Sequence, residues 1–128
     1  METKEKDYEK LKSILLSYMD SKSLEIIDEY YNYALKIYEG MTRLTKEEYI
    51  CHAIRVSTIL AMLKMDTTTI GCALIHEGIT LEKVTPEEIT EYFGVDVLTI
   101  LNSISKLSHL KRTFKGNDTD KYRRIVVG

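Results

Sequence analysis

Apolar residues recur along this chain every three or four positions, which is the period of an amphipathic α-helix. Stretches of this kind run over residues 8–18, 24–38 and 49–63. Gly40 follows the second stretch and is predicted to close it, because glycine readily adopts the left-handed conformation that ends many helices. The sequence shows no sustained alternation of apolar and polar residues, the usual sign of a β-strand.

A fourth helix is expected from residue 70 to about residue 77, where nearly every position is apolar. Such a helix has to be surrounded by other helices, so we place it at the centre of the fold. Asp66 or one of the threonines at 67–69 can cap its start, since their oxygens accept hydrogen bonds from the free N–H groups of a first turn.

A fifth helix has a clear start signal in the sequence TPEE at residues 85–88. A threonine followed three positions later by glutamate forms a capping box, and proline suits the first helical position. Val84 and Ile89 have the spacing of a hydrophobic staple across this start. Gly94 is predicted to end the helix.

A sixth helix is expected from five apolar positions that share one face: Val97, Ile100, Leu101, Ile104 and Leu107. Residues 115–120, KGNDTD, then form a loop that can cap a short seventh helix from Lys121. Together the pattern predicts an all-α bundle of about six to seven helices in one domain. A short last helix is marginal without a partner, so we expect the chain to be the N-terminal fragment of a longer protein.

Composition places the chain among ordinary globular proteins, with 128 residues, 44% hydrophobic and 30% charged. No apolar run reaches the ~18 residues of a membrane span, and the lysine-rich start is not a signal peptide. We therefore expect no membrane partner. Cys51 and Cys72 lie in apolar helical stretches and are interpreted as buried free thiols, which favours the reducing cytoplasm.

Charge is unevenly distributed, although the net charge of −2 gives no case for direct nucleic-acid binding. From residue 104 onward there are seven Lys or Arg and two Asp, which makes a local net charge of +5. This end is either a solvated basic face or an edge that faces an anion. Lys106, Lys111 and Arg112 are candidate phosphate contacts on charge alone.

Histidines supply the candidate chemistry. His109 lies among lysines in a loop-like region and is interpreted as a surface residue. His52 and His76 lie within apolar helical stretches, and Glu77 follows the second of them directly. Two imidazoles and a carboxylate suit a divalent transition metal, which would activate a bound water. The alternative, that both are hydrogen-bonded core histidines, remains open at this point.

Four stretches then point to a family. EEYICHAIRVSTILAMLKMD, at 47–66, has a tyrosine three positions before a histidine. TTTIGCALIHE, at 67–77, leads to a histidine and a carboxylate. VTPEEITEYFGVDVLTILNSISKL and DKYRRIVV follow at 84–107 and 120–127. Together they resemble the hydrolase domain of the RelA/SpoT proteins, a member of the HD phosphohydrolase superfamily. The resemblance implies an all-helical domain that removes 3′-pyrophosphate from ppGpp and pppGpp with the help of Mn²⁺.

The resemblance assigns roles residue by residue. His52 falls on the first metal histidine and His76 on the second. Glu77 stands where the family has a metal aspartate, so a carboxylate is kept but with a longer reach. Arg43 falls on a basic residue that helps to hold the guanine base, and Thr45 on a small hydroxyl residue near it. A further metal aspartate of the family lies beyond the last residue of this chain.

The strongest departure concerns catalysis. The family has a catalytic Glu-Asp pair four and five positions after the second histidine, where this chain has Thr80 and Leu81. General acid–base catalysis contributes ~10²- to 10⁴-fold in rate, so losing both acids should be severe. We therefore interpret the chain as a single degenerate HD-type domain over residues 1–128. By resemblance it is hydrolase-inactive and a structural and regulatory partner of an alarmone synthetase domain that follows it.

Two other hypotheses remain. One is an active Mn²⁺-dependent (p)ppGpp hydrolase of altered design, in which Glu77 binds the metal and Glu82 replaces the missing acids. The other is a helical interaction module without a ligand, in which His52 and His76 are core residues. Turnover with Mn²⁺ that is lost in His76→Ala would support the first. Imidazoles hydrogen-bonded to the backbone would favour the second.

Overall fold

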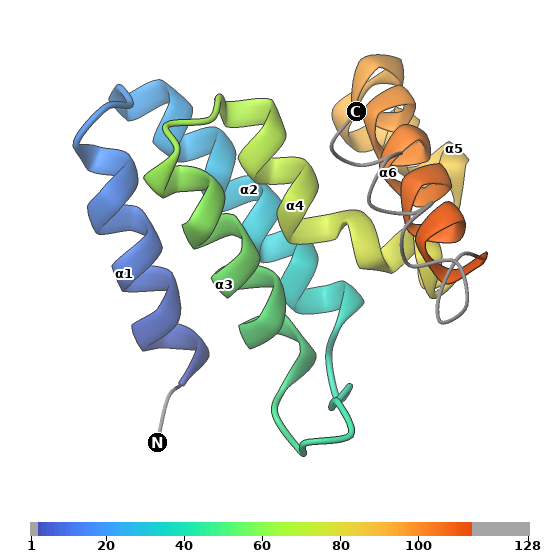
Figure 1. Cartoon of the computed structure of the whole chain (residues 1–128). Coiled ribbons are helices and arrows are strands. Elements are labelled where there is room, and N and C mark those ends of the chain that lie inside the picture. The colour runs from blue at the N-terminus through green and yellow to red at the C-terminus, as the bar shows by residue number, and fades with distance from the viewer. Residues whose placement is uncertain (1–2, 114–128) are drawn as a thin grey trace.

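A computed structural model describes residues 3–113 of the chain, and these residues form six α-helices (Figure 1). The helices are α1 (Lys4–Leu16), α2 (Ser21–Ile37), α3 (Tyr49–Met62), α4 (Thr67–Thr80), α5 (Pro86–Phe93) and α6 (Val95–Thr113). The only extended pairing in the described range is an isolated antiparallel bridge between Thr42 and Glu48. The all-α prediction is confirmed, whereas the expected loop at 115–120 and the seventh helix lie outside the described residues.

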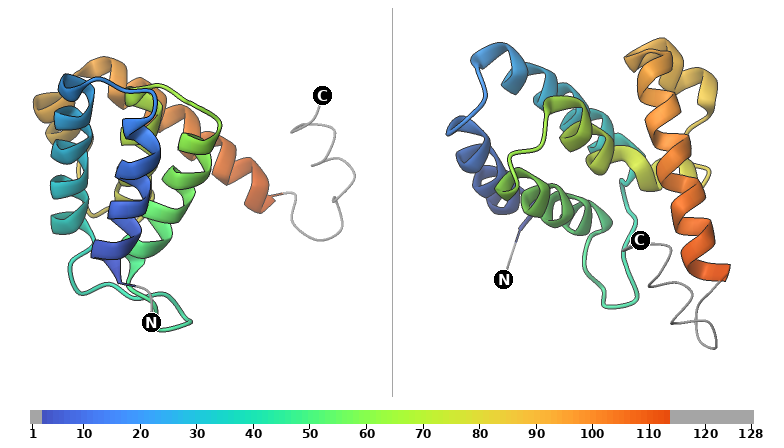
Figure 2. Two further views of the ribbon diagram at one scale, coloured as in Figure 1. Left: turned by 90° about the vertical axis from the view of Figure 1, so that its left-hand side faces the viewer. Right: turned by 45° about the horizontal axis from the view of Figure 1, so that its top comes forward.

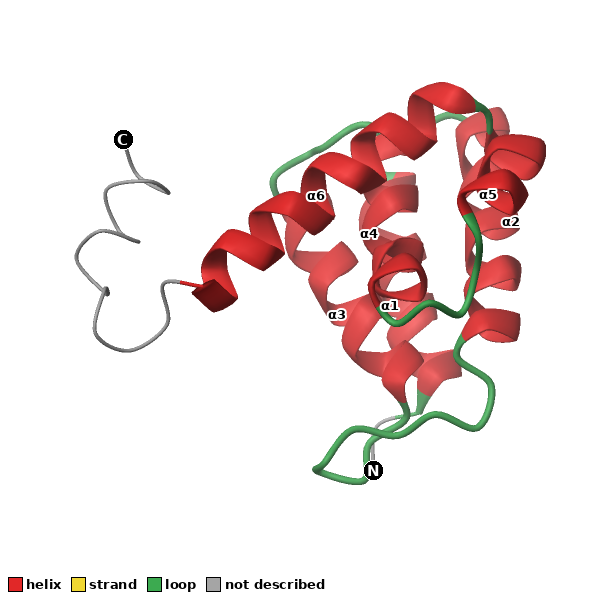
Figure 3. Ribbon diagram, turned by 90° about the vertical axis from the view of Figure 1, so that its right-hand side faces the viewer, coloured by secondary structure: helices red, strands yellow, loops and turns green. Residues whose placement is uncertain are grey.

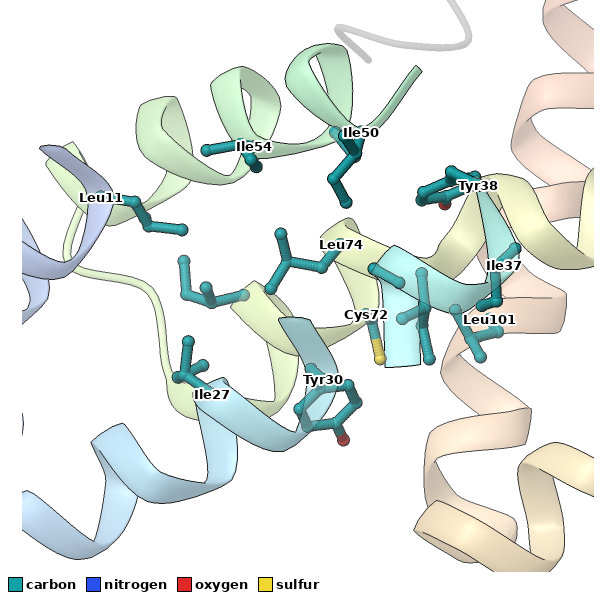
Figure 4. Close-up of a cluster of buried hydrophobic side chains, with 14 of the residues drawn as sticks. Leu11, Ile27, Tyr30, Ile37, Tyr38, Ile50, Ile54, Cys72, Leu74 and Leu101 are labelled. Atoms are coloured by element: carbon teal, nitrogen blue, oxygen red, sulfur yellow. The ribbon is translucent and has the colours of Figure 1, made fainter. Parts of the chain in front are cut away.

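Helix α4 is the centre of the fold, as its apolar sequence predicts. It contacts α2, α3 and α6, while α1 packs on α3 and α5 on α6. Figure 1 shows α1 at one side of the molecule and the α5–α6 pair at the other, and Figure 3 shows α6 crossing α4. Four residues of α4 are fully buried: Ile70, Cys72, Leu74 and Ile75. They pack with side chains from the surrounding helices in a single hydrophobic core (Figure 4).

The helix starts follow the capping signals. Asp66 caps α4, and its carboxylate accepts the N–H of Thr69 at 2.9 Å. Thr85 caps α5, and its hydroxyl oxygen accepts the N–H of Glu88 at 3.2 Å. The Glu88 carboxylate accepts the Thr85 hydroxyl at 3.3 Å, so the reciprocal half of the capping box is a side-chain contact. Val84 and Ile89 are both buried in the core, in accord with the predicted staple.

One helix ends later than expected, and two helices are followed by a left-handed residue that is not glycine. Helix α4 reaches Thr80, three residues past the predicted end. Lys64 after α3 and Glu82 after α4 each have φ 57°, in the left-handed region. After α3, the N–H of Lys64 donates to the carbonyl oxygen of Ala61 at 2.9 Å. The N–H of Met65 donates to the carbonyl oxygen of Leu60 at 3.2 Å. This is the Schellman arrangement, formed here without glycine.

Close backbone packing joins α2 to α4. A Cβ atom on Gly71 would overlap the ring of Tyr30, and one on Gly78 would come within 2.9 Å of Ile37. The ring of Tyr30 also stacks on Phe93 of α5, with centroids 4.3 Å apart. Tyr30 therefore connects three helices at one point.

The two cysteines agree with the sequence-based expectation. Cys51 and Cys72 are buried free thiols. Burial raises the pKa of each thiol to about 11, so both are protonated near neutral pH. Among the helices of residues 3–113, none combines the length and apolarity that a membrane crossing requires.

Candidate functional site

The predicted metal residues come from two neighbouring helices. His52 lies in the second turn of α3, and His76 and Glu77 lie in the last turns of α4. The loop at residues 39–48, between α2 and α3, carries Arg43 and Thr45. Arg43 reaches His52, but Thr45 is exposed and lines a separate hollow of about 770 Å³ beside the start of α1. The structure thus separates the two residues that the resemblance assigns to guanine.

Arg43 lies against the first histidine. Its guanidinium Nη1 is 3.2 Å from Nδ1 of His52 and 3.8 Å from the carboxylate of Glu47. Glu47 also pairs with Arg55. Burial and the positive charges of Arg43 and Arg55 together lower the pKa of His52. A neutral His52 can accept an N–H from Arg43 at Nδ1.

The second histidine forms an ion pair with its neighbour in sequence. Nε2 of His76 is 2.9 Å from Oε1 of Glu77, and Nδ1 is 3.3 Å from the carbonyl oxygen of Ala73. Burial opposes the charged imidazole, but the hydrogen bond and charge of Glu77 outweigh it and raise the pKa of His76. The same hydrogen bond lowers the pKa of Glu77 against the effect of burial. Both ring nitrogens face acceptors, which is the arrangement of a protonated imidazole.

Two tyrosines complete this region. The hydroxyl of Tyr49 donates to Oε2 of Glu77 at 3.2 Å, and its ring lies edge-on to His52 at 6.3 Å. Tyr38 stacks on Tyr49 with centroids 5.4 Å apart and is only 3% exposed. Sequence reasoning placed Tyr49 three positions before His52 but gave it no role. That spacing puts both residues on one face of α3, and this was the available signal.

The donor geometry falls short of a metal site. Nε2 of His76 and Oε1 of Glu77 are 2.9 Å apart. Two ligands at ~2.1 Å from one ion and at right angles are about 3 Å apart, so this pair could bind the same ion. However, no group of three His, Cys, Asp or Glu side chains in the described part of the chain could hold a metal ion. His52 instead turns Nδ1 toward Arg43. The described side chains do not fit a metal in this arrangement, and the Mn²⁺ assignment stays a prediction.

Thr80 and Leu81, which the resemblance places at the positions of the catalytic acids, lie at the end of α4. The hydroxyl of Thr80 donates to the carbonyl of His76 within the same helix, at 3.5 Å. Leu81 is the C-cap residue and its side chain is 39% exposed. Glu82 follows in the left-handed conformation and is exposed. Within residues 3–113, neither a hydrogen bond nor an ion pair connects Glu82 to the two histidines.

The three candidate phosphate residues, Lys106, Lys111 and Arg112, lie on α6. Lys106 is exposed, which fits a solvent-facing residue. His109, Lys111 and Arg112 belong to the same helix. The prediction that His109 lies in a loop-like region was therefore wrong, because the helix continues through the lysine-rich segment to Thr113.

Comparison with known proteins agrees with the predicted family. The chain belongs to the HD-domain family, whose model matches residues 31–128. This match covers α3 and α4, the two helices that carry His52, His76 and Glu77. Within that family the chain is a RelA/SpoT-type domain, as its sequence motifs predict.

Three relatives illustrate the likeness. The guanosine-3′,5′-bis(diphosphate) 3′-pyrophosphohydrolase of Vibrio cholerae is 32% identical over 121 residues. The bifunctional (p)ppGpp synthase/hydrolase SpoT of Escherichia coli is 30% identical over 121 residues. Each alignment covers 94% of this chain but 17% of the relative. The GTP pyrophosphokinase of Myxococcus xanthus is 31% identical over 114 residues, which is 86% of this chain and 15% of the relative. The chain therefore spans about one sixth of the length of these curated relatives.

Proposed function

We propose that this chain is a degenerate (p)ppGpp hydrolase-type HD domain that no longer hydrolyses its nucleotide. In this proposal it serves as a structural and regulatory partner of an alarmone synthetase domain in the same cytoplasmic polypeptide. The names of the relatives, which include both hydrolases and synthetases of (p)ppGpp, support the choice of nucleotide. Arg43 is the residue through which a guanine nucleotide would still be contacted.

The observation that carries the proposal is the chemistry at the end of α4. A methyl-bearing hydroxyl at Thr80 and a hydrocarbon at Leu81 stand where the family has two acids. Thr80 bonds to its own helix, and Leu81 has no group that can move a proton or orient a water. The loss of acid–base assistance alone would slow the reaction by ~10²- to 10⁴-fold.

A second function is favoured by one specific observation. The 2.9 Å separation of His76 and Glu77 is suited to two ligands of one ion, so an active Mn²⁺-dependent hydrolase of altered design is the alternative. In that case Glu82 would have to leave its exposed position after α4 and replace the missing acids. His76 and Glu77 would hold the metal, and the metal would supply an activated water.

The test is ppGpp hydrolysis by the full-length polypeptide that carries this sequence, measured as pyrophosphate released in the presence of Mn²⁺. Native protein should release none above the uncatalysed rate. A Thr80→Glu/Leu81→Asp variant shows whether the pocket still supports turnover when the acids are restored. Release by the native protein that disappears in His76→Ala would overturn the proposal and establish the alternative.

A further inference from the structure

The predicted metal residues already have protein partners, and Arg43 is one of them. Five residues form what we call the site cluster: Arg43, Tyr49, His52, His76 and Glu77. Each contact joins two of its members: Arg43 to His52 at 3.2 Å, Tyr49 to Glu77 at 3.2 Å and His76 to Glu77 at 2.9 Å. The ring of Tyr49 lies edge-on to His52 and connects the two halves.

The carboxylate of Glu77 is engaged at both oxygens. Oε1 faces Nε2 of His76, and Oε2 accepts the hydroxyl of Tyr49. Its side chain is only 23% exposed and that of His76 only 16%. A half-buried carboxylate is costly unless its oxygens are hydrogen-bonded, and here protein donors fulfil that requirement.

The first predicted ligand is occupied as well. Nη1 of Arg43 lies 3.2 Å from Nδ1 of His52 and so takes the place that a metal ion would need at this nitrogen. Glu47, which pairs with both Arg43 and Arg55, holds this guanidinium on the side of the loop. A divalent cation at His52 would have to displace Arg43, and at Oε2 of Glu77 it would have to displace the hydroxyl of Tyr49.

We propose that the site cluster is a self-contained polar crosslink that holds the loop at 39–48 and α3 against α4 without a divalent metal. Arg43 ties the loop to α3, Tyr49 ties α3 to α4, and His76 holds the other oxygen of the carboxylate that Tyr49 binds. The inference deepens the proposed function, because it states what the inherited metal residues do once catalysis is gone. It rests on the assignment of the chain as a degenerate hydrolase.

The first experiment measures metal binding directly. Mn²⁺ is titrated into the purified 128-residue chain, and the free ion is followed by its electron paramagnetic resonance signal. We expect no saturable binding below about 1 mM and the same Tm with added Mn²⁺ or with EDTA, because a ligand bound only by the native state would raise the Tm. Saturable Mn²⁺ binding that raises the Tm and is lost in His76→Gln would overturn the proposal.

The second experiment tests the crosslink by removing single hydroxyl groups. Tyr49→Phe removes the bond to Glu77 and should lower the Tm by about 2–6 °C. Tyr33→Phe is the matched control, because the buried Tyr33 hydroxyl makes no well-formed hydrogen bond among the described residues and interacts only weakly with the Glu88 carboxylate. That variant should keep the Tm of the native chain. Equal effects of the two substitutions would contradict the crosslink.

The outcomes also separate this inference from the proposed function. Tight Mn²⁺ binding without pyrophosphate release would overturn the metal-free crosslink and leave the degenerate hydrolase standing. Release of pyrophosphate would overturn the degenerate hydrolase whatever Tyr49→Phe does to the Tm. A Tm that falls in Tyr49→Phe and does not change when Mn²⁺ is added supports the crosslink.

Discussion

The ring of Tyr30 on α2 packs directly on Gly71 of α4. Its Cδ2, Cε2 and Cζ atoms occupy the space that a Cβ atom of residue 71 would need. Phe93 of α5 restrains the ring as well, because it stacks on it with an interplanar angle of 6°. The ring therefore has little freedom to move aside.

Gly71→Ala should destabilise the fold for this reason. Alanine is intrinsically better than glycine inside a helix by about 1 kcal/mol, so propensity alone predicts a gain. We expect the overlap of the new methyl group with the Tyr30 ring to outweigh this gain and to lower the free energy of unfolding by about 1–3 kcal/mol. Urea denaturation followed by circular dichroism measures it, and a variant more stable than the native chain would contradict the tight contact.

Gly78→Ala introduces a milder overlap on the same helix and is compared with Gly71→Ala. Its new Cβ would lie 2.9 Å from Cγ2 of Ile37, the end of a side chain rather than a fixed ring. The penalty should therefore be smaller than that of Gly71→Ala. Combining Gly71→Ala with Tyr30→Leu should recover part of the loss, and that coupling isolates the ring as its cause.

Two helix ends offer a stabilising change. Lys64 and Glu82 both have φ 57°, a conformation that costs a residue with a Cβ roughly 1–2 kcal/mol. Lys64→Gly should raise the free energy of unfolding by about 0.5–1 kcal/mol, after the extra entropy of glycine in the unfolded chain is subtracted. Lys64→Ala keeps the penalty and serves as the control. Chemical denaturation measures the free energy of unfolding of both variants. Equal stabilisation by Lys64→Ala and Lys64→Gly would contradict the expectation.

The contact between α1 and α2 predicts a loss of stability in acid. Oδ1 of Asp28 accepts hydrogen bonds from Nζ of Lys12 at 2.7 Å and from the hydroxyl of Tyr8. Partial burial opposes the carboxylate, but the bonds from Lys12 and Tyr8 outweigh it and lower the pKa of Asp28. A carboxyl with a lower pKa in the folded state binds fewer protons there than when unfolded, so its stabilisation is complete above the ordinary pKa near 4 and disappears below it.

The Asp28→Asn variant tests the direction of this pH dependence of stability. The native chain should be more stable than the variant from pH 5 to 7, and the difference should shrink as the pH falls through 4 and below. The size is modest, because the Asp28 side chain is 46% exposed and water screens the ion pair. A difference that grows toward low pH would contradict the assignment. Denaturation midpoints at a series of pH values provide the measurement.

Restoring acids at the end of α4 should leave the fold intact. Thr80 and Leu81 lie at the C-terminal end of the helix, where negative charge is unfavourable by about 0.3–1 kcal/mol per group. Thr80→Glu/Leu81→Asp should therefore lower the Tm by several degrees while keeping the helical circular dichroism spectrum. Thr80→Gln/Leu81→Asn is the uncharged control and should lose less. A variant that unfolds would point to a packing role for Leu81.

Helical periodicity and capping signals predicted most of the fold. The apolar run before His76 correctly located the central helix, and Asp66 and Thr85 marked the two best-defined starts. The end of α4 could not be read in the same way, because Glu82 adopts a glycine-like conformation without being glycine. His109 was misplaced because a cluster of lysines is equally compatible with a loop and with an exposed helix.

The site was predictable as a set of residues but not as a set of contacts. Sequence placed His52, His76 and Glu77 on helices that do become neighbours. It could not show that Arg43 turns to His52 while Thr45 points elsewhere, because the path of the loop decides both. The partnership of Tyr49 with Glu77 spans 28 positions and depends on how α3 and α4 pack.

The arrangement around α4 has a consequence for cooperativity. Within residues 3–113, helices α5 and α6 pack on each other and contact the other helices mainly through α4 and through the rings of Tyr30 and Tyr33 on α2. Figure 2 shows the far half of α6 extending away from the body formed by α1 to α4. Amide protons of α5 and α6 should therefore exchange with solvent as one sub-global unit, ahead of those in α4. Helices α5 and α6 would then unfold and refold together while the core that carries His52 and His76 stays folded.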